Sequence, residues 1–388
     1  MALAFFGLIG FLIPREHLKK YYLLVAFILS TSLVFYNPPE TDDLYRYYNM
    51  FDIIKDLSFK DLLNGQFGVT DWYYNYMLSD YMQSSRTFMV ILFVIAKLGI
   101  KQLLPMLFCM LSYVPIVILI DKLGKREELS RLALNFAYIT MLFCFDFRFA
   151  TLLRNPSSYA LFALLLYIDL VENRNKWFCF IGYILLCGLH MASVVLVFIR
   201  ILIGVFRSRF RKTICIVLLF MNTLLQLIIM VLSTFGGGFT YITRLIKRIN
   251  DYYYGRTAYN INGAMFFVGS IIVTLIVFAF VATHVEQSEE DEKFSLCYLY
   301  LTFFTIGSIK QYDILVRNTK LIVLLCIPSI LYFFNNFVRS YRNHLYIMPT
   351  KNGKVVTSFV TFVSIMCLII TSILFYTLFS YMPMQAGF

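Results

Sequence analysis

Residues 177–206 read WFCFIGYILLCGLHMASVVLVFIRILIGVF, a mostly apolar stretch that lies between two basic loops. Arg174 precedes it and Arg207 follows it, and short loops rich in Lys and Arg are typical of the cytoplasmic side of a membrane. With both flanks on that side, the stretch must cross the membrane twice and turn back in its middle. It therefore predicts two short helices with a break near residues 188–190.

The composition of the whole chain points to the same class of protein. Of 388 residues, 60% are hydrophobic and only 14% are charged, and the mean hydropathy is +0.73, which excludes an ordinary soluble domain. Apolar runs near the roughly 20 residues that a spanning helix needs recur about twelve times. The sequence thus predicts an all-α, polytopic transmembrane helical bundle that forms one membrane domain over residues 1–388. We expect spans near residues 2–13, 18–36, 101–120, 131–147, 156–172, 177–189, 190–206, 213–233, 263–284, 294–309, 319–336 and 355–380.

The positive charge of the chain lies mainly in short loops and does not indicate a nucleic-acid-binding surface. The net charge of +12 comes largely from short basic loops, which we place inside, and no nucleic-acid motif accompanies them. The eight cysteines fall within apolar runs without metal-type spacing, so we expect them to be small core residues. Placing all basic loops inside requires that 87–100, which is short for a span, be a re-entrant or interfacial helix on the outer side. Both termini and three conspicuous segments then lie outside: 37–86, 233–263 and 310–320.

The break near His190 is the first candidate site. A discontinuous helix at membrane depth leaves backbone groups unpaired, which is tolerated only against protein or a water-filled cavity. His190 either faces such a cavity as a catalytic group or only bonds a freed carbonyl at the break.

The first outer segment carries an acidic and aromatic helix. Pro38 and Pro39 end the preceding helix, and helical spacing places Asp43, Arg46 and Tyr47 on one face. This face suits either a capped interfacial helix or contact with a polar substrate such as a sugar. The same segment holds aromatic side chains that fit an interfacial belt or stacking on sugar rings: Trp72, Tyr73, Tyr74 and Tyr76.

Two arginines lie at the outer ends of neighbouring spans. An arginine at this depth is energetically costly and usually has an acidic partner or a bound anion. Arg148 has Asp146 close by in sequence, whereas Arg154 has no obvious local partner. Arg154 is therefore the stronger candidate for an anion ligand.

Further cations lie in the later outer segments. Arg244, Lys247 and Arg248 fall on one helical face at spacings of three and four, with Tyr252 one turn on. They suit either a surface anchor for acidic headgroups or ligands of a phosphate or diphosphate. Arg317 begins a late span from the same side. An anionic, lipid-attached substrate fits this set best: arginines for a diphosphate, apolar grooves for a polyprenyl chain, and aromatic and acidic groups for sugars.

These features resemble the EpsG-like and Wzy-type polymerases of bacterial O-antigen and capsular polysaccharide. The resemblance is carried by short motifs, with a topology that covers the whole chain. These are Asp43 to Tyr47 (DLYRY), Arg148 to Tyr159 with its Arg-Asn pair, Leu189 to Ser193 (LHMAS), the Arg248 to Tyr252 spacing, and Arg317.

The resemblance implies a GT-C-like glycosyltransferase of the bacterial inner membrane that acts at the periplasmic face without metal or nucleotide sugar. It would move a growing glycan from undecaprenyl diphosphate onto the next lipid-linked repeat unit, among membrane lipids and with a Wzz-type chain-length regulator as a partner. Pro156 departs from the expected uninterrupted helix and leaves open whether Arg148 or Arg154 takes the role of the family's arginine. Asp43 and His190 both remain candidates for the general base. The rival functions are a lipid-linked oligosaccharide flippase and an O-antigen ligase.

Overall fold

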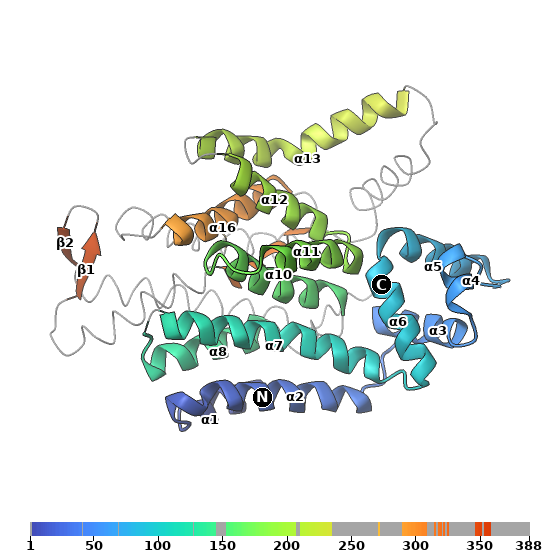
Figure 1. Ribbon diagram of the computed structural model, residues 1–388, viewed down its shortest axis with the longest axis horizontal. Coiled ribbons are helices and arrows are strands. Elements are labelled where there is room, and N and C mark those ends of the chain that lie inside the picture. Colours follow the sequence, from blue (N-terminus) through green and yellow to red (C-terminus); the bar gives the residue numbers. More distant parts are fainter. Residues whose placement is uncertain are drawn as a thin grey trace, which may run out of the picture. The chain divides into compact units, whose positions relative to one another are not determined.

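A computed structural model gives the architecture of the chain (Figure 1). It describes residues 2–40, 42–68, 70–126, 128–144, 153–206, 210–234, 271, 289–308, 314–315, 317–319, 321–322, 324–325, 346–350 and 353–357. The chain divides into two compact units, Met1–Phe198 and Ile199–Phe388, and the boundary between them falls inside one helix, α12. Each unit is described by itself.

The first unit is helical throughout its described residues. Its elements are α1 (Ala2–Gly10), α2 (Arg15–Ser32), the 3-10 turn η1 (Leu33–Phe35), α3 (Asp43–Ile54), α4 (Phe59–Asn64), α5 (Trp72–Ser84), α6 (Arg86–Leu98), α7 (Leu103–Arg126), α8 (Arg131–Cys144), α10 (Arg154–Leu170), α11 (Lys176–Leu189) and the start of α12 (Ser193–Val205).

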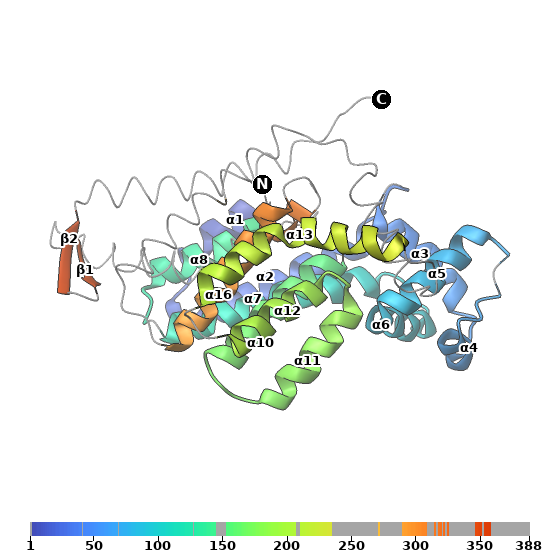
Figure 2. The same cartoon turned by 90° about the horizontal axis from the view of Figure 1, so that it is seen from above.

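Long helices of this unit pack around α7, which contacts α2, α8 and α10 (Figure 1). Beyond one end of α7 lie the shorter helices α3 to α6, grouped together in both views (Figures 1 and 2). A buried contact between Tyr22 and Asn135, 2.7 Å from hydroxyl to amide oxygen, ties α2 to α8. Tyr22 also stacks on Tyr138, with ring centroids 4.3 Å apart.

Local sequence sets the ends of the short helices. Ser58 and Asp61 form a capping box at the start of α4, and Gly65 ends that helix at a positive φ of 69°. The Asp71 carboxylate accepts a hydrogen bond from the Tyr73 backbone N–H and begins α5. Ser85, with φ −147° and ψ 51°, separates α5 from α6. Three side chains of the candidate site described below lie at or near this junction: Tyr81, Ser85 and Phe88.

The break predicted near residues 188–190 is confirmed. The stretch 87–100, expected as a short re-entrant or interfacial helix, forms α6, and its position in a membrane stays a prediction. The 13 residues of α6 extend about 20 Å, which is short of the roughly 30 Å of a bilayer core. The stretch 177–206 forms α11 and α12, separated at residues 190–192. Among the described helices, two are long and apolar enough to cross a membrane: α2 with η1, and α7. The full set of about twelve spans stays a prediction.

Besides the end of α12, the described residues of the second unit include two packed helices and a hairpin. α13 (Arg211–Thr234) and α16 (Glu289–Gly307) lie against each other, and an added Cβ at Gly307 would meet the Leu219 carbonyl oxygen at 2.1 Å, so glycine allows this close contact. Strands β1 (Tyr346–Thr350) and β2 (Gly353–Thr357) pair antiparallel, with Tyr346 opposite Thr357. The expected all-α class is confirmed for the described residues, apart from this short hairpin, which the sequence did not predict. The hairpin takes up the first three residues of the span expected at 355–380.

Candidate functional site

Arg154 occupies the first position of α10. The preceding residue, Leu153, has a positive φ of 54° and turns the chain sharply into the helix. The Ser157 hydroxyl donates to the Leu153 carbonyl at 2.7 Å and so satisfies a backbone acceptor at the turn. Pro156 lies in the first turn, where its missing N–H would have no helical partner. The expected disruption at Pro156 is therefore absent, because the helix starts just before it.

The Arg154 guanidinium reaches helices α3 and α5 and the junction between α5 and α6. Its Nε donates to the Tyr47 hydroxyl of α3 at 2.9 Å, and Nη1 donates to the Ser85 hydroxyl between α5 and α6 at 3.1 Å. Nη2 donates to the Tyr81 hydroxyl of α5 at 3.3 Å. One planar group thus fixes the relative positions of α3, α5 and α10.

Three aromatic rings surround the same cation. The guanidinium carbon lies 4.5 Å from the ring centroid of Tyr81, 5.3 Å from that of Phe88 and 5.6 Å from that of Tyr47. These distances are within the range of cation–π attraction. We call these four residues, together with Ser85, the Arg154 cluster: Tyr47, Tyr81, Ser85, Phe88 and Arg154.

The charge of Arg154 is balanced by no acidic hydrogen-bond partner in the described part of the chain. Each of its three acceptors is a neutral hydroxyl oxygen. Burial raises the pKa of the Tyr47 phenol well above its usual range, and the neighbouring Arg154 charge only partly opposes that rise. Tyr47 therefore stays protonated, and the cluster carries a net positive charge held in a fixed geometry.

The cluster also presents hydrogen-bond donors. A hydroxyl that accepts one hydrogen bond still has its own O–H to donate. Tyr47 and Ser85 are buried, whereas Arg154 and Tyr81 are half-buried. A cation with three ordered hydroxyls can bind an anionic oxygen-rich group such as a phosphate.

Asp43 and Arg46 lie on α3, Asp43 one turn before Tyr47 and Arg46 directly before it. As the spacing predicted, they share a face, and Arg46 Nη1 lies 3.4 Å from Asp43 Oδ1. Arg46 therefore has an acidic partner, in contrast with Arg154. Asp42 precedes α3 as its N-cap residue, but its carboxylate accepts from the Tyr36 hydroxyl at 2.5 Å instead of capping the helix.

The broken helix approaches the cluster through α6. Gly188 of α11 lies so close to Thr87 that an added Cβ would meet the Thr87 Oγ1 at 2.3 Å. Thr87 is two residues from Ser85 of the cluster. His190, two residues after Gly188, is in extended conformation and half-buried. The structure thus brings the break at His190 and the helix that carries Phe88 together.

An exposed aromatic edge borders the same helices. Trp72 and Tyr76 of α5 are 78% and 53% exposed. Behind them, the Asn49 amide donates to the Tyr74 hydroxyl at 2.7 Å and joins α3 to α5. These side chains are available for stacking on a sugar ring or for an interfacial belt, the two alternatives that the sequence left open.

The remaining predicted residues lie in the second unit or outside the described residues. Arg317 lies in a helical stretch of the second unit and is half-buried. The others lie outside the described residues: Arg148, Arg244, Lys247, Arg248 and Tyr252.

Sequence reasoning missed three members of the cluster: Tyr81, Ser85 and Phe88. They follow each other at spacings of four and three, which in a sequence is the pattern of one helical face, although in the structure Ser85 separates α5 from α6. That pattern was available in the sequence. The spacing was not informative by itself, since only the fold shows that Arg154 at the start of α10 contacts these three residues.

Metal binding and known relatives give no further guide to the chemistry. In the described part of the chain, no group of three or more His, Cys, Asp or Glu side chains could hold a metal ion. Comparisons with models of protein families, with curated proteins and with solved structures found no match to this chain.

Proposed function

We propose that this chain is a membrane polysaccharide polymerase with a GT-C-like bundle of about twelve spans. It would transfer a growing glycan from undecaprenyl diphosphate to the next lipid-linked repeat unit, in O-antigen, capsule or exopolysaccharide synthesis. The observation that carries the proposal is the Arg154 cluster, a cation whose described hydrogen bonds all go to neutral oxygens. The resemblance of the chain's short sequence motifs to those of Wzy-type polymerases also supports a glycan transfer reaction.

A diphosphate suits the cluster as a ligand. Arginine matches phosphate oxygens with a planar set of donors, and the hydroxyls of Tyr47, Tyr81 and Ser85 add donors around it. In the reaction, the bond between the anomeric carbon and the diphosphate oxygen breaks, and the diphosphate leaves with the electron pair. Fixed positive charge at that oxygen stabilises the developing negative charge.

The acceptor side of the reaction needs a base. The hydroxyl oxygen of the lipid-linked acceptor forms the new bond to the anomeric carbon, and its proton passes to a side chain of the protein. Asp43 on α3 and His190 at the helix break are the two candidates. The exposed aromatic side chains of α5 would contact the sugars.

Apolar surface supports the placement in a membrane. On α11, Phe178, Phe180 and Ile184 are each more than half exposed, and α2 exposes Leu24 and Phe27 to a similar extent. Faces of this kind are unfavourable in water and favourable against lipid tails. The expected position is the bacterial inner membrane, with the Arg154 cluster on the periplasmic face.

The test is a strain that lacks this gene, complemented with Arg154→Ala, with the surface glycan separated on a gel. We expect single repeat units where the wild-type protein gives a ladder. Arg131→Ala is the control, because Arg131 is an exposed arginine at the start of α8 and should leave the ladder unchanged. A full ladder from well-expressed Arg154→Ala would overturn the proposal. Loss of all surface repeats, with lipid-linked units retained inside, would indicate a flippase instead.

A further inference from the structure

A second polar site lies at the opposite end of α10 from Arg154. A pocket of about 410 Å³ opens between the start of α2, the end of α7 and the residues that follow α10. Its charged lining residues are Lys19, Asp121, Lys122, Lys125, Arg126 and Glu172. The 17 residues of α10 separate it from the Arg154 cluster by about 25 Å. We call it the lysine pocket.

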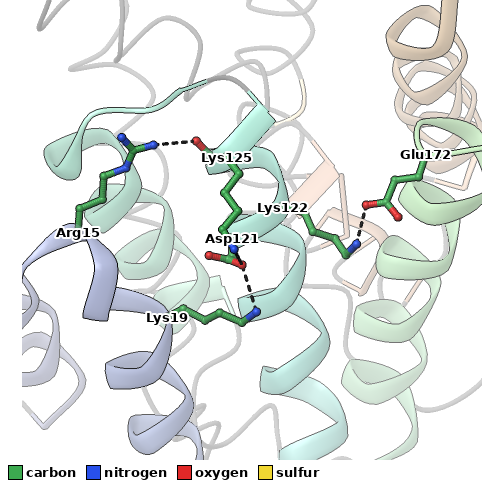
Figure 3. A network of polar contacts seen from close by, with 7 residues as sticks. Arg15, Lys19, Asp121, Lys122, Lys125 and Glu172 are labelled. Carbon is green, nitrogen blue, oxygen red and sulfur yellow. Dashed lines mark hydrogen bonds and ion pairs between the residues drawn. The ribbon is translucent and has the colours of Figure 1, made fainter.

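Two carboxylates organise the lysines of this pocket (Figure 3). Asp121 is buried, and one of its oxygens, Oδ2, lies 3.1 Å from Lys19 Nζ and 3.0 Å from Lys125 Nζ. Lys122 lies 2.5 Å from the Glu172 carboxylate. These salt bridges therefore hold the three lysine ammonium groups at the pocket, although the Lys125 side chain is 73% exposed.

The lining carries more positive than negative charge. Lys19, Lys122, Lys125 and Arg126 contribute four positive charges, and Asp121 and Glu172 contribute two negative charges, so the excess is two. A lysine ammonium has three N–H donors, and one salt bridge leaves donors for another acceptor. The pocket is therefore complementary to an anion with several oxygens, such as a phosphate group.

The position of the pocket indicates where that phosphate comes from. The two helices long and apolar enough to cross a membrane, α2 with η1 and α7, both reach the pocket, α2 with its first residues and α7 with its last. The pocket thus lies where these helices would leave the lipid, among loops that are typical of the cytoplasmic side. Basic pockets between membrane helices on that side bind phospholipid headgroups.

We propose that the lysine pocket binds the phosphate of an anionic phospholipid from the cytoplasmic leaflet. The inference rests on the membrane placement in the proposed function but not on the glycosyl transfer. The bound lipid would hold the ends of α2, α7 and α10 together, at a distance from the proposed reaction.

The test uses the full chain in nanodiscs of phosphatidylcholine, to which phosphatidylglycerol is added, with bound lipid counted by native mass spectrometry. We expect selective retention of phosphatidylglycerol. Lys19→Gln and Lys125→Gln should each weaken it about fivefold, since one lysine near a lipid phosphate contributes roughly 1 kcal/mol. Either variant leaves Asp121 one lysine partner, which protects the fold, and Lys125→Arg should restore binding.

The matched control is Lys20→Gln. Lys20 is exposed, adjacent to Lys19 in sequence and not part of the pocket lining. An equal loss in Lys20→Gln and Lys19→Gln would show general attraction to the basic surface and overturn the proposal. Inorganic phosphate is the second control. If it displaced the lipid, and also stabilised the protein equally in nanodiscs of pure phosphatidylcholine, the pocket would be a site for free phosphate and the proposal would be overturned. Because no readout here involves glycan transfer, a failed ladder assay leaves this result unchanged.

Discussion

Arg154 Nε and the Tyr47 hydroxyl are 2.9 Å apart, although 107 positions separate them in the chain. The contact joins the first turn of α10 to α3, and α3 also carries Asp43 one turn earlier. A diphosphate ligand at Arg154 and a base at Asp43 would therefore be aligned by the same hydrogen bond. Changes at either end of this contact should affect glycan transfer.

Arg154→Lys should lower the transfer rate strongly while preserving the charge. A lysine ammonium is a single point of donation and cannot reach Tyr47, Ser85 and Tyr81 from the three corners of a planar group. Loss of aligned donors at a developing negative charge predicts a decrease on the order of 100-fold. The rate is measured with purified protein and lipid-linked repeat units. A near wild-type rate would mean that charge alone is sufficient and that the observed geometry is unimportant.

Tyr47→Phe should destabilise the fold as well as reduce transfer. The substitution keeps the buried ring but removes the oxygen that accepts from Arg154 Nε, and an unsatisfied buried donor costs about 1 to 3 kcal/mol. The free energy of unfolding in detergent measures this loss. Tyr76→Phe is the matched control, because Tyr76 is 53% exposed and should change stability little. Equal stability of the two variants would contradict the role given to the Tyr47 hydroxyl.

The same variant should show a weaker response to alkaline pH. Burial raises the pKa of Tyr47 in the folded protein, so the unfolded state loses this proton first, near pH 10. The stability contributed by neutral Tyr47 is complete below that pH and is lost as the pH rises from there. Above about pH 10, the stability of Tyr47→Phe should fall less steeply, by about 1.4 kcal/mol per pH unit. Parallel stability curves above pH 10 would show that Tyr47 ionises equally in both states.

Features that depend on local sequence could be predicted. The break at His190 followed from the basic loops on both sides of 177–206, and the short helix α6 followed from the length of its apolar run. The shared face of Asp43 and Arg46 followed from helical spacing. Each of these features is fixed by residues close together in the chain.

Features that depend on how distant parts of the chain pack together could not be predicted from the sequence. Three of the four cluster partners of Arg154, namely Tyr81, Ser85 and Phe88, come from α5, α6 and their junction, and nothing in their sequence shows which helix start will meet them. The hairpin β1–β2 was missed for another reason. Val355 and Val356 belong to an apolar run, and such a run has the same composition whether it begins a span or forms a strand.

Gly188→Ala tests whether the contact between α11 and α6 positions the cluster. The added Cβ would lie 2.3 Å from Thr87 Oγ1 and 3.3 Å from the Thr87 backbone nitrogen, so one of the helices must shift. Overpacking of this kind costs about 1 to 3 kcal/mol, and a shift of α6 would move Ser85 and Phe88 relative to Arg154. We expect a lower unfolding midpoint and a shorter glycan ladder.

Two further variants separate this effect from a general loss of glycine. Thr87→Ala removes Oγ1, so the double variant Gly188→Ala with Thr87→Ala should recover part of both the stability and the ladder, a non-additive result typical of residues in contact. In Gly204→Ala the added Cβ would meet only the Arg200 guanidinium, at 2.9 Å, and that flexible end can move aside. If the double variant were no better than Gly188→Ala, the defect would lie in the α11 backbone. If Gly204→Ala were equally impaired, helix packing at Thr87 would not explain the loss.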